Sequence, residues 1–460
     1  MAAPGPVAAS AASGLSRRLA EFVAASVPDD LPGDVRAHAV RAVVNGFGTA
    51  LGGAADEALA HLALAVMPFS AVPQATVIGR ALRADMPTAA FLNAAAINVF
   101  DFDDNHAGTI IHPTAAVLPV ALALAETRPV TGAALIHAVA LGIEVACRIG
   151  NAVSPGHYDR GWHITATCGV FGAAVAAARL LDLDPTRTLW ALGNASAQAA
   201  GLVETLGHMA KSVGVGAAAR NGLMSALMAE AGVAGPERPL EGPRGFLAVC
   251  CDAPRPDRAQ AGLGSRWELM NDMFKPYPCG VVLNPVVDAC LVARADPAFD
   301  AVRVVRITLR GNPLLKARTD RPGVVTGREA QVSAQHAVAV TLLRGSAGIA
   351  DFSDSAVRDP AVRALATRVA AIEADVSVPV EAANLMIDMA GGTLIEVAIP
   401  LGRGNPGRPM TDDDLAAKFA ALARHGAPAV DAGRLATALW QLPDADRAGP
   451  LMALTQPRQA

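Results

Sequence analysis

Acidic side chains and imidazoles gather in one short stretch of the chain, the DFDDNH segment at 101–106, which His112 follows closely. The stretches on either side are almost wholly apolar. Carboxylates buried there would need partners, because an isolated buried charge costs several kcal/mol. Carboxylates can hold histidine tautomers, and imidazoles can move protons or bind anions. The segment predicts a pocket rim formed by Asp101, Asn105, His106 and His112; the alternative is a helix end followed by a capped loop.

A second candidate segment, GHYDRGWHITAT at 156–167, combines two histidines, a tyrosine and a tryptophan just ahead of a predicted helix. Thr165 or Thr167 is expected to cap that helix. The dipole at its N-terminus would favour an anion near His163. This segment is therefore expected to supply a proton-transfer group, His163, and two substrate contacts, Tyr158 and Thr165.

Lysine is rare in this chain, which uses arginine for almost all of its positive charge. Only four of the 38 basic residues are lysines: Lys211, Lys275, Lys316 and Lys418. Lys211 follows a glycine-rich connection at 201–210, and Lys275 opens the KPYPCG segment, whose prolines make it extended. A compact ammonium suits a carboxylate ligand, so Lys211 is expected to face a substrate carboxylate. Lys275 and Tyr277 are expected to reach the cleft between the domains, with Tyr277 as a substrate contact. The alternative for Lys211 is a side chain that reaches solvent.

The composition excludes several classes of protein. The formal charge is 38 − 42 = −4, without the clustered Lys and Arg of a nucleic-acid-binding surface. Hydrophobic residues make up 52% of the chain and its mean hydropathy is +0.34, which supports a large core. The longest uncharged stretches, such as 161–178, are built from Ala, Gly and Thr rather than Leu, Ile and Phe. We therefore expect tightly packed internal helices and no membrane span.

The first residues and the cysteines bear on location. The N-terminal stretch MAAPGPVAASAASG has neither a charged nor an apolar signal region, so we expect a short disordered lead rather than a secretory signal. Six cysteines without a C-x-x-C pair fit buried free thiols in a reducing cytoplasm.

Apolar residues at helical spacing predict an N-terminal half made only of helices. Small side chains dominate these segments, so the helices are expected to approach one another closely. The predicted helical segments are 15–65 (two helices broken at Pro32 and Gly33), 87–126 (two helices interrupted at 101–114), 131–150, 168–181, 185–203 and 212–232.

The second half changes character after a Pro-, Gly- and Arg-rich stretch at 235–266, which is typical of a linker. Three runs with β-branched alternation predict strands at 302–311, 368–378 and 392–402, with helices between them at 279–295, 330–344 and 354–366. A final helix is predicted from Thr411 to Gly426.

The predicted fold is mainly α with an α+β part. It has a large all-helical domain at 1–255, completed by the C-terminal tail 405–460, and a smaller α+β lid domain at 256–404. The acids and histidines match no metal-ligand spacing, and no glycine-rich phosphate loop follows a strand. No metal and no cofactor are therefore expected.

These segments, in this order, resemble the MmgE/PrpD family, which includes 2-methylcitrate dehydratase, cis-aconitate decarboxylase and iminodisuccinate epimerase. The resemblance covers nearly the whole chain. It rests on the stretches DFDDNHAGTIIHPTAAVLPVALALAE at 101–126, ALGIEVACRIG at 140–150, GWHITATCGVFGAAVAAARLL at 161–181, the region 211–222, KPYPCG at 275–280 and PMTDDDLAAKF at 409–419. It implies a helical domain with an inserted lid, a homodimer, and neither organic cofactor nor metal.

Carried across residue by residue, the family's pocket maps to Asp101, Asn105, His112, His163, Lys211 and Lys275. The decarboxylase branch commonly has Thr in place of Asn105 and a catalytic histidine in place of Gly280. Many relatives also carry histidine in place of Asn284. Both histidine differences remove an imidazole from the lid segment and argue against decarboxylation.

The sequence therefore predicts a cofactor-independent lyase, a dehydratase of a small hydroxylated di- or tricarboxylate. His163 is the expected base, Lys211 and Lys275 the clamp, and Asp101 the residue that orients His112. Lys275 is expected to enter the substrate cleft from the lid. Three alternatives stay open: a cis-aconitate-type decarboxylase, a carbon epimerase of an iminodisuccinate-like acid, and an inactive carboxylate-binding protein.

Overall fold

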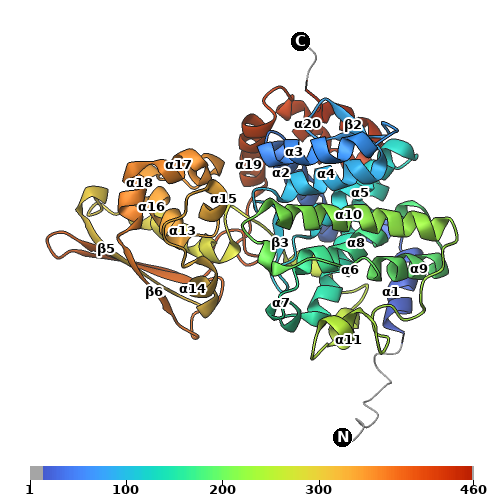
Figure 1. Cartoon of the computed structure of the whole chain (residues 1–460), viewed down its shortest axis with the longest axis horizontal. Helices are drawn as coiled ribbons and strands as arrows, with labels where there is room; N and C mark the ends of the chain where they lie inside the picture. The colour runs from blue at the N-terminus through green and yellow to red at the C-terminus, as the bar shows by residue number, and fades with distance from the viewer. Residues whose placement is uncertain (1–13, 458–460) are drawn as a thin grey trace, which may run out of the picture. The chain divides into compact units, whose positions relative to one another are not determined.

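The computed structural model describes residues 14–457, so residues 1–13 of the predicted lead lie outside it. The chain divides into two compact units (Figure 1). The helical unit comprises the chain up to Val99, Asp103–Asp272, and the chain from Leu415 onward. The lid unit comprises Phe100–Phe102 and Met273–Asp414. The predicted class, mainly α with a smaller α+β part, is confirmed.

The helical unit is mostly helical, with a short antiparallel hairpin and the three-residue strand β3 (Asp104–His106), neither of which the sequence predicted. The hairpin pairs β1 (Ala75–Val77) with β2 (Leu82–Ala84). The helices are α1 (Leu15–Ala25), α2 (Gly33–Gly53), α3 (Glu57–Val66), α4 (Met86–Asn98), α5 (Pro113–Thr127), α6 (Gly132–Val153), α7 (Gly156–Asp159), α8 (Ile164–Leu180), α9 (Pro185–Ser196), α10 (Met209–Glu230), α11 (Phe246–Cys250), α12 (Pro256–Gln260), α19 (Asp412–Gly426) and α20 (Ala432–Trp440).

Small residues let the central helices approach closely, as the sequence predicts. A Cβ added at Gly142 on α6 would lie 2.7 Å from the backbone oxygen of Gly172 on α8. A Cβ added at Gly222 on α10 would lie 2.4 Å from the Cβ of Ala173. Real Cβ atoms do not approach so closely. These glycines therefore bring α6, α8 and α10 into backbone contact, which keeps the helix ends in register.

The C-terminal helices return to the start of the chain, as predicted. The red helices α19 and α20 lie beside the blue α2 and α3 in Figure 1. A Cβ added at Gly48 on α2 would lie 3.1 Å from the ring of Phe419. At the start of α19, Asp414 N donates to Thr411 Oγ1 and Thr411 N donates to Asp414 Oδ2, which confirms Thr411 as the cap.

Helix α6 is long and apolar enough to cross a membrane, and the bent pair of α2 with the segment Glu57–Phe69 also meets that test. In α6, 89% of the most apolar window is buried inside the protein, between α5 and α8. Its side chains include Glu144 and Arg148, both fully buried. Helix α6 is therefore the central core helix of this unit.

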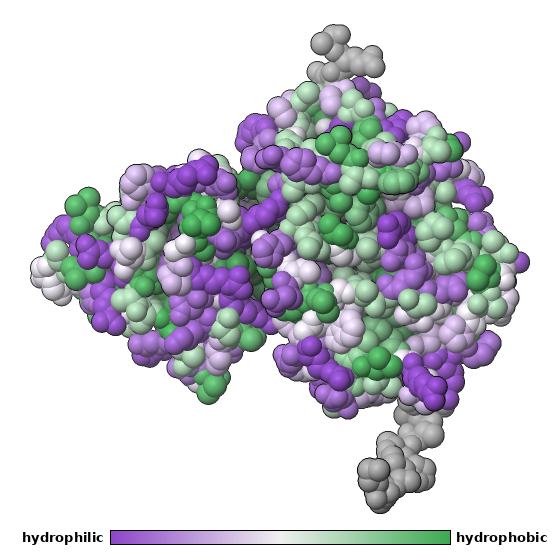
Figure 2. Space-filling view, viewed as in Figure 1, coloured by the Kyte–Doolittle hydropathy of each residue, from purple (hydrophilic) through white to green (hydrophobic). Residues whose placement is uncertain are grey.

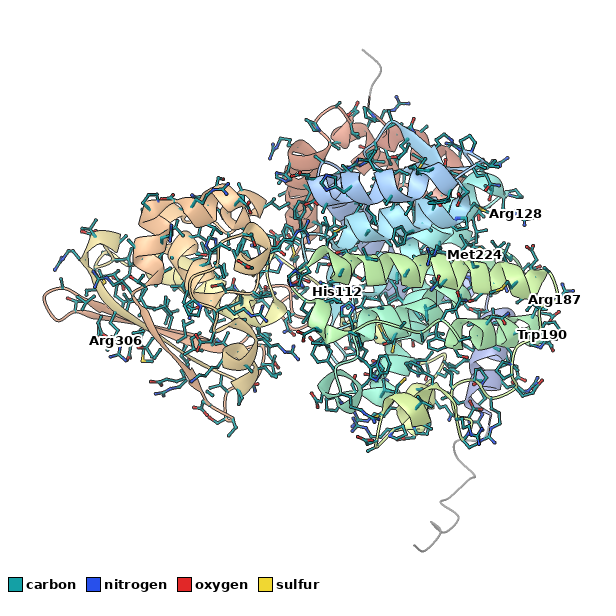
Figure 3. The ribbon with its side chains drawn as sticks, in the orientation of Figure 1. His112, Arg128, Arg187, Trp190, Met224 and Arg306 are labelled. Atoms are coloured by element: carbon teal, nitrogen blue, oxygen red, sulfur yellow. The ribbon has the colours of Figure 1, made fainter. Side chains whose placement is uncertain are left out.

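The lid unit is built on a four-stranded sheet in the order β6-β5-β7-β8, in which only the β5–β6 pair is parallel. Ile307 and Leu309 of β5 face the core, whereas Arg306 lies on the exposed face (Figure 3). Hydrophilic residues cover much of the visible lid surface (Figure 2). The elements are β5 (Val304–Gly311), β6 (Val369–Ala374), β7 (Ala383–Met389), β8 (Leu394–Ile399), α13 (Asn284–Arg294), α14 (Pro313–Thr319), α15 (Gly327–Ala330), α16 (Ala334–Arg344), α17 (Asp354–Arg358) and α18 (Pro360–Ala366).

Strand β7 was not predicted. Its sequence, ANLMIDM, contains a single β-branched residue, so propensity gave no signal. Its pairing on both sides, with β5 and β8, makes it a strand.

The predicted domain boundaries need correction. The first lies after Asp272 rather than after 255, and the second after Asp414 rather than after 404. Residues 256–272 belong to the helical unit because Arg148 of α6 donates to the backbone oxygens of Ala259, Ala261 and Gly262. The stretch 235–266 is therefore a packed segment that contains α11 and α12, not a linker.

The second boundary has its own anchor. Arg408 donates to the Asp288 carboxylate and to the backbone oxygen of Leu401, and the Arg403 guanidinium pairs with Asp414. These contacts hold residues 403–414 to the lid unit.

Candidate active site

Three long helices of the helical unit begin at histidines. His112 is the N-cap of α5, His163 of α8 and His208 of α10. None of the three uses its side chain to cap its helix. The imidazoles are therefore not used up in capping.

Contacts bring the three helix starts to one place. The backbone N–H of His112 donates to Thr165 Oγ1 in the first turn of α8, over 3.1 Å. A Cβ added at Gly214 in α10 would lie 3.6 Å from the Cβ of Ala166. At the far ends, Arg128 after α5 pairs with Glu230, the last residue of α10, over 3.3 Å. Figure 3 shows His112 and Arg128 at opposite ends of the helical unit. Helices α5, α8 and α10 thus direct their N-termini to a common region, where their dipoles favour negative charge.

A chain of hydrogen bonds joins these helix starts through the Asp101–His112 region. His112 Nδ1 bonds Asp103 Oδ1 over 3.0 Å, and Asn98 Nδ2 donates to Asp103 Oδ2 over 2.9 Å. Ser212 Oγ, beside Lys211, donates to Asn98 Oδ1 over 3.3 Å. We call His112, Asp103, Asn98 and Ser212 the relay cluster; it connects the start of α5 with the start of α10.

The partner of His112 Nδ1 is therefore Asp103; the orientation of His112 by Asp101 stays a prediction. Asp103 is fully buried and lies in the 101–106 segment, so the sequence did point to the group of acids to which it belongs. The choice among its three aspartates was not visible in the sequence. Asn98 and Ser212 were missed because single polar residues in apolar helices gave no pattern.

The turn before His112 is strained. Ile110 has a φ of +59°, a conformation that a β-branched residue rarely adopts. Its N–H donates to the His106 oxygen, and its own oxygen accepts from Asn105 Nδ2 over 3.1 Å. Asn105 thus supports the turn that positions His112. Its Oδ1 is buried without a recorded hydrogen-bond partner among residues 14–457, and the predicted substrate contact by Asn105 stays a prediction.

Lys211 occupies the first turn of α10 and is only 9% exposed. That burial does not fit a side chain that reaches into solvent. His163 is 4% exposed, and its backbone N–H donates to the Gly201 oxygen, where Gly201 has a φ of +149°. The loop that ends at α10 therefore also anchors the start of α8.

Helix α8 begins at Ile164, before Cys168, the predicted start. Thr165 and Thr167 consequently lie inside its first turn and do not cap it. Thr167 Oγ1 bonds His157 Nε2 over 2.7 Å, and His157 Nδ1 bonds the Cys250 oxygen. Burial lowers the pKa of His157 to about 4, so His157 is a neutral structural residue. Tyr158 is half-buried on α7, and its substrate contact stays a prediction.

Two predicted substrate contacts are engaged elsewhere. His106 is fully buried; its Nδ1 bonds Thr109 over 2.8 Å and its Nε2 lies 3.4 Å from Glu268. The nearby His106 is the main reason that the pKa of Glu268 falls to about 2. His106 is therefore part of the core rather than of a pocket rim.

Tyr277 is likewise corrected. In the lid unit its hydroxyl donates to Asp288 over 2.6 Å, and burial together with Asp288 raises the pKa of Tyr277. Its hydroxyl is therefore held inside the lid.

Lys275 belongs to the lid unit and is 2% exposed. Its Nζ donates to the backbone oxygen of Asp101 over 2.9 Å and lies 3.1 Å from the Asp101 carboxylate. Asp101 has a φ of +52°, so this contact is made by a constrained backbone. The two predicted catalytic residues thus form one ion pair, and their contact with substrate stays a prediction.

Gly280 also lies in the lid. A Cβ there would meet the Gln331 oxygen at 3.8 Å and a methyl of Val332 at 3.9 Å, both ordinary contacts. The position has room for a side chain, which this chain does not use.

Comparisons with known proteins show a family for this chain. The MmgE/PrpD N-terminal domain matches residues 17–259 and the MmgE/PrpD C-terminal domain matches residues 277–442. A cis-aconitate decarboxylase-like protein of Aspergillus oryzae is 28% identical over 89% of this chain and 90% of its own length. Cis-aconitate decarboxylase of Aspergillus terreus is 32% identical over 60% of this chain and 59% of its own. Cis-aconitate decarboxylase of Mus musculus is 29% identical over 77% of this chain and 75% of its own. These relatives support a lyase-type enzyme.

Proposed function

The chain belongs to the MmgE/PrpD family, and from that premise we propose that it is a cofactor-independent lyase that eliminates water from a small hydroxylated di- or tricarboxylate. The observation that carries this proposal is the meeting of three helix N-termini at His112, His163 and the first turn of Lys211. Such a region favours carboxylates and supplies imidazoles beside them.

The chemistry begins at a carbon next to a carboxylate. Lys211 and the helix dipoles stabilise the charge that develops on that carboxylate when the carbon loses its proton. His163, buried at the start of α8, is the proposed base. His112, held by Asp103, is the proposed acid that protonates the leaving hydroxyl. The carbon–oxygen bond breaks, water leaves, and an unsaturated acid remains.

Decarboxylation is the second candidate. Its support is the similarity to proteins named as cis-aconitate decarboxylases. Gly280 counts against it, because the decarboxylase branch is expected to have a histidine there. The two candidates share the substrate class and differ in the bond that breaks.

One experiment separates the candidates. Purified protein is mixed with a panel of hydroxylated and unsaturated di- and tricarboxylates in deuterated water and followed by proton NMR, with carbon dioxide release measured in parallel. New alkene signals without carbon dioxide support the dehydratase. Carbon dioxide release would replace it with the decarboxylase, deuterium uptake without loss of water with an epimerase, and binding without any turnover with a carboxylate-binding protein.

A further inference from the structure

We propose that Asp103 is the positioning residue that holds a proton on His112 Nδ1 and so makes Nε2 the nitrogen that gains and loses a proton, and that Asn98 and Ser212 fix the Asp103 carboxylate in place. The inference rests on the proposed function, since it concerns how His112 transfers a proton. Asp103 does not touch substrate in this proposal; it acts through the imidazole.

The ring geometry carries the first step. Asp103 is fully buried and its Oδ1 lies 3.0 Å from His112 Nδ1. An ionised carboxylate is only an acceptor, so Nδ1 must carry a proton. The neutral imidazole then presents a lone pair at Nε2, and the charged imidazole gives up its proton from Nε2. In both directions the proton that moves is the one on the nitrogen away from Asp103.

The second step concerns the other oxygen of Asp103. Asn98 must place its amide nitrogen toward Asp103 Oδ2, again because a carboxylate only accepts. Ser212 Oγ donates to the amide oxygen of Asn98, which locks the same orientation. Ser212 thus donates to Asn98, and Asn98 donates to one oxygen of Asp103, while His112 Nδ1 donates to the other oxygen. Asp103 accepts on both sides, and this pattern leaves a single tautomer for the neutral His112 ring.

The pattern of donors around Asp103 leads to a specific prediction for Asp103→Asn. The new amide must offer its oxygen to Asn98, which only donates on that side. Its nitrogen then faces His112 Nδ1, and this donor forces the neutral ring to carry its proton on Nε2. The neutral His112 ring therefore changes from the Nδ1–H to the Nε2–H tautomer, although asparagine has nearly the same size and shape as aspartate. Adding Asn98→Ala removes the donor that imposes this orientation, so the amide can turn and Nδ1 can recover its proton.

The test uses full-length protein labelled with ¹⁵N-histidine, in which the His112 signals are assigned by their loss in His112→Gln. The ¹⁵N shifts should show an Nδ1–H tautomer in the parent and an Nε2–H tautomer in Asp103→Asn. The variant should lose roughly 100-fold or more in kcat with little change in KM, because substrate binding is not its role. The double variant Asn98→Ala/Asp103→Asn should regain the Nδ1–H tautomer and part of kcat.

Asp104→Asn is the matched control. Asp104 is the neighbouring residue, is equally buried, and accepts from the backbone N–H of Thr114 instead of from His112. It should leave the His112 tautomer unchanged. An Nδ1–H tautomer in Asp103→Asn, or a double variant no better than the single one, overturns the inference.

The tautomer measurement needs no substrate. Absence of turnover with every acid therefore rejects the proposed function and leaves the Asp103 assignment to be decided by NMR.

Discussion

Two buried clusters in the described part of the helical unit each place a histidine beside a carboxylate. The relay cluster joins His112, Asp103, Asn98 and Ser212 at the starts of helices. The second, which we call the core cluster, consists of His106, Glu268, Arg148 and Glu144. Their difference lies in how the hydrogen-bonding groups are used.

In the core cluster every N–H group of the Arg148 guanidinium is hydrogen-bonded. The five N–H donors of Arg148 meet five acceptors: Glu144 Oε1 and the backbone oxygens of Ala259, Ala261, Gly262 and Arg266. Glu144 Oε2 accepts from the backbone N–H of Leu269. This arrangement ties 259–269 to α6 and is structural. In the relay cluster Asp103 accepts from Asn98 on one side and from His112 Nδ1 on the other, and a carboxylate that holds an imidazole in one orientation suits proton transfer.

The largest effect is expected from Arg148→Ala, which attacks the core cluster. It leaves the buried Glu144 carboxylate without its charge partner, and breaking a buried pair costs about 3–5 kcal/mol. Burial already raises the pKa of Glu144, and loss of Arg148 raises it further. Proton uptake by the folded variant then offsets part of the loss at low pH, so the deficit should grow as pH rises.

Chemical unfolding at pH 5 and pH 8 measures this. Arg17→Ala, which removes an exposed pair with Glu237, is the control and should cost no more than about 1 kcal/mol. Equal stability of the Arg148 variant and the parent would mean that the core cluster is not structural.

His112→Gln attacks the relay cluster and should separate activity from stability. We expect kcat to fall about 10²- to 10⁴-fold, because general acid catalysis is lost. The loss of melting temperature should be small, because the glutamine amide still offers a donor to the buried Asp103 carboxylate. His106→Gln is the matched comparison, since both histidines come from one segment: it should lower stability and leave kcat within about threefold. If both variants lost activity equally, the contrast between the two clusters would disappear.

Variants of Lys211 test whether a site for a substrate carboxylate lies beside the relay cluster. Lys211→Ala and Lys211→Arg should both lower kcat/KM, by about 30- to 1,000-fold or roughly 2–4 kcal/mol. The planar guanidinium is larger than an ammonium and presents a fork rather than a point charge. Matching thermal melts exclude loss of fold. An arginine variant with near-normal turnover would remove Lys211 from the site.

Asp104→Asn gives a smaller effect on stability. Burial raises the pKa of this fully buried carboxyl. A raised folded-state pKa contributes stability that is present at low pH and lost as pH rises through it. Because asparagine cannot ionise, the melting temperature of the variant relative to the parent should increase from pH 5 to pH 8. The exposed Asp29→Asn should show no such trend; a trend of opposite sign for Asp104→Asn would mean that Asp104 is ionised and favourably paired.

The smallest effect is expected from chelation. Asp103 and His112 are residue types that metals take, yet we propose that they bind each other for proton transfer. Turnover should therefore be unchanged by EDTA and by added divalent ions. Loss of turnover on chelation, restored by a divalent ion, would recast Asp103 and His112 as ligands and remove the relay cluster from the mechanism.

The sequence by itself located most of the helices and three of the four strands of the lid sheet. Helical periodicity with glycine and proline breaks located the helical segments, including the start of α2 near Asp34 and the end of α19 at Gly426. The rarity of lysine pointed to Lys211 and Lys275, both buried in the structure. These are local properties, set by residues close to one another along the chain.

Only the tertiary structure decided which polar group serves which partner. His106 and His112 lie in the same segment, and the sequence does not distinguish them. In the structure His106 contacts Glu268 from a distant segment, whereas Thr165 and Asp103 hold His112. Tyr277 is likewise engaged by Asp288. A buried hydrogen bond depends on the position of both partners. Helix packing, through close approaches such as Gly142 against Gly172, brings residues far apart in the sequence into contact, and no local pattern encodes that outcome.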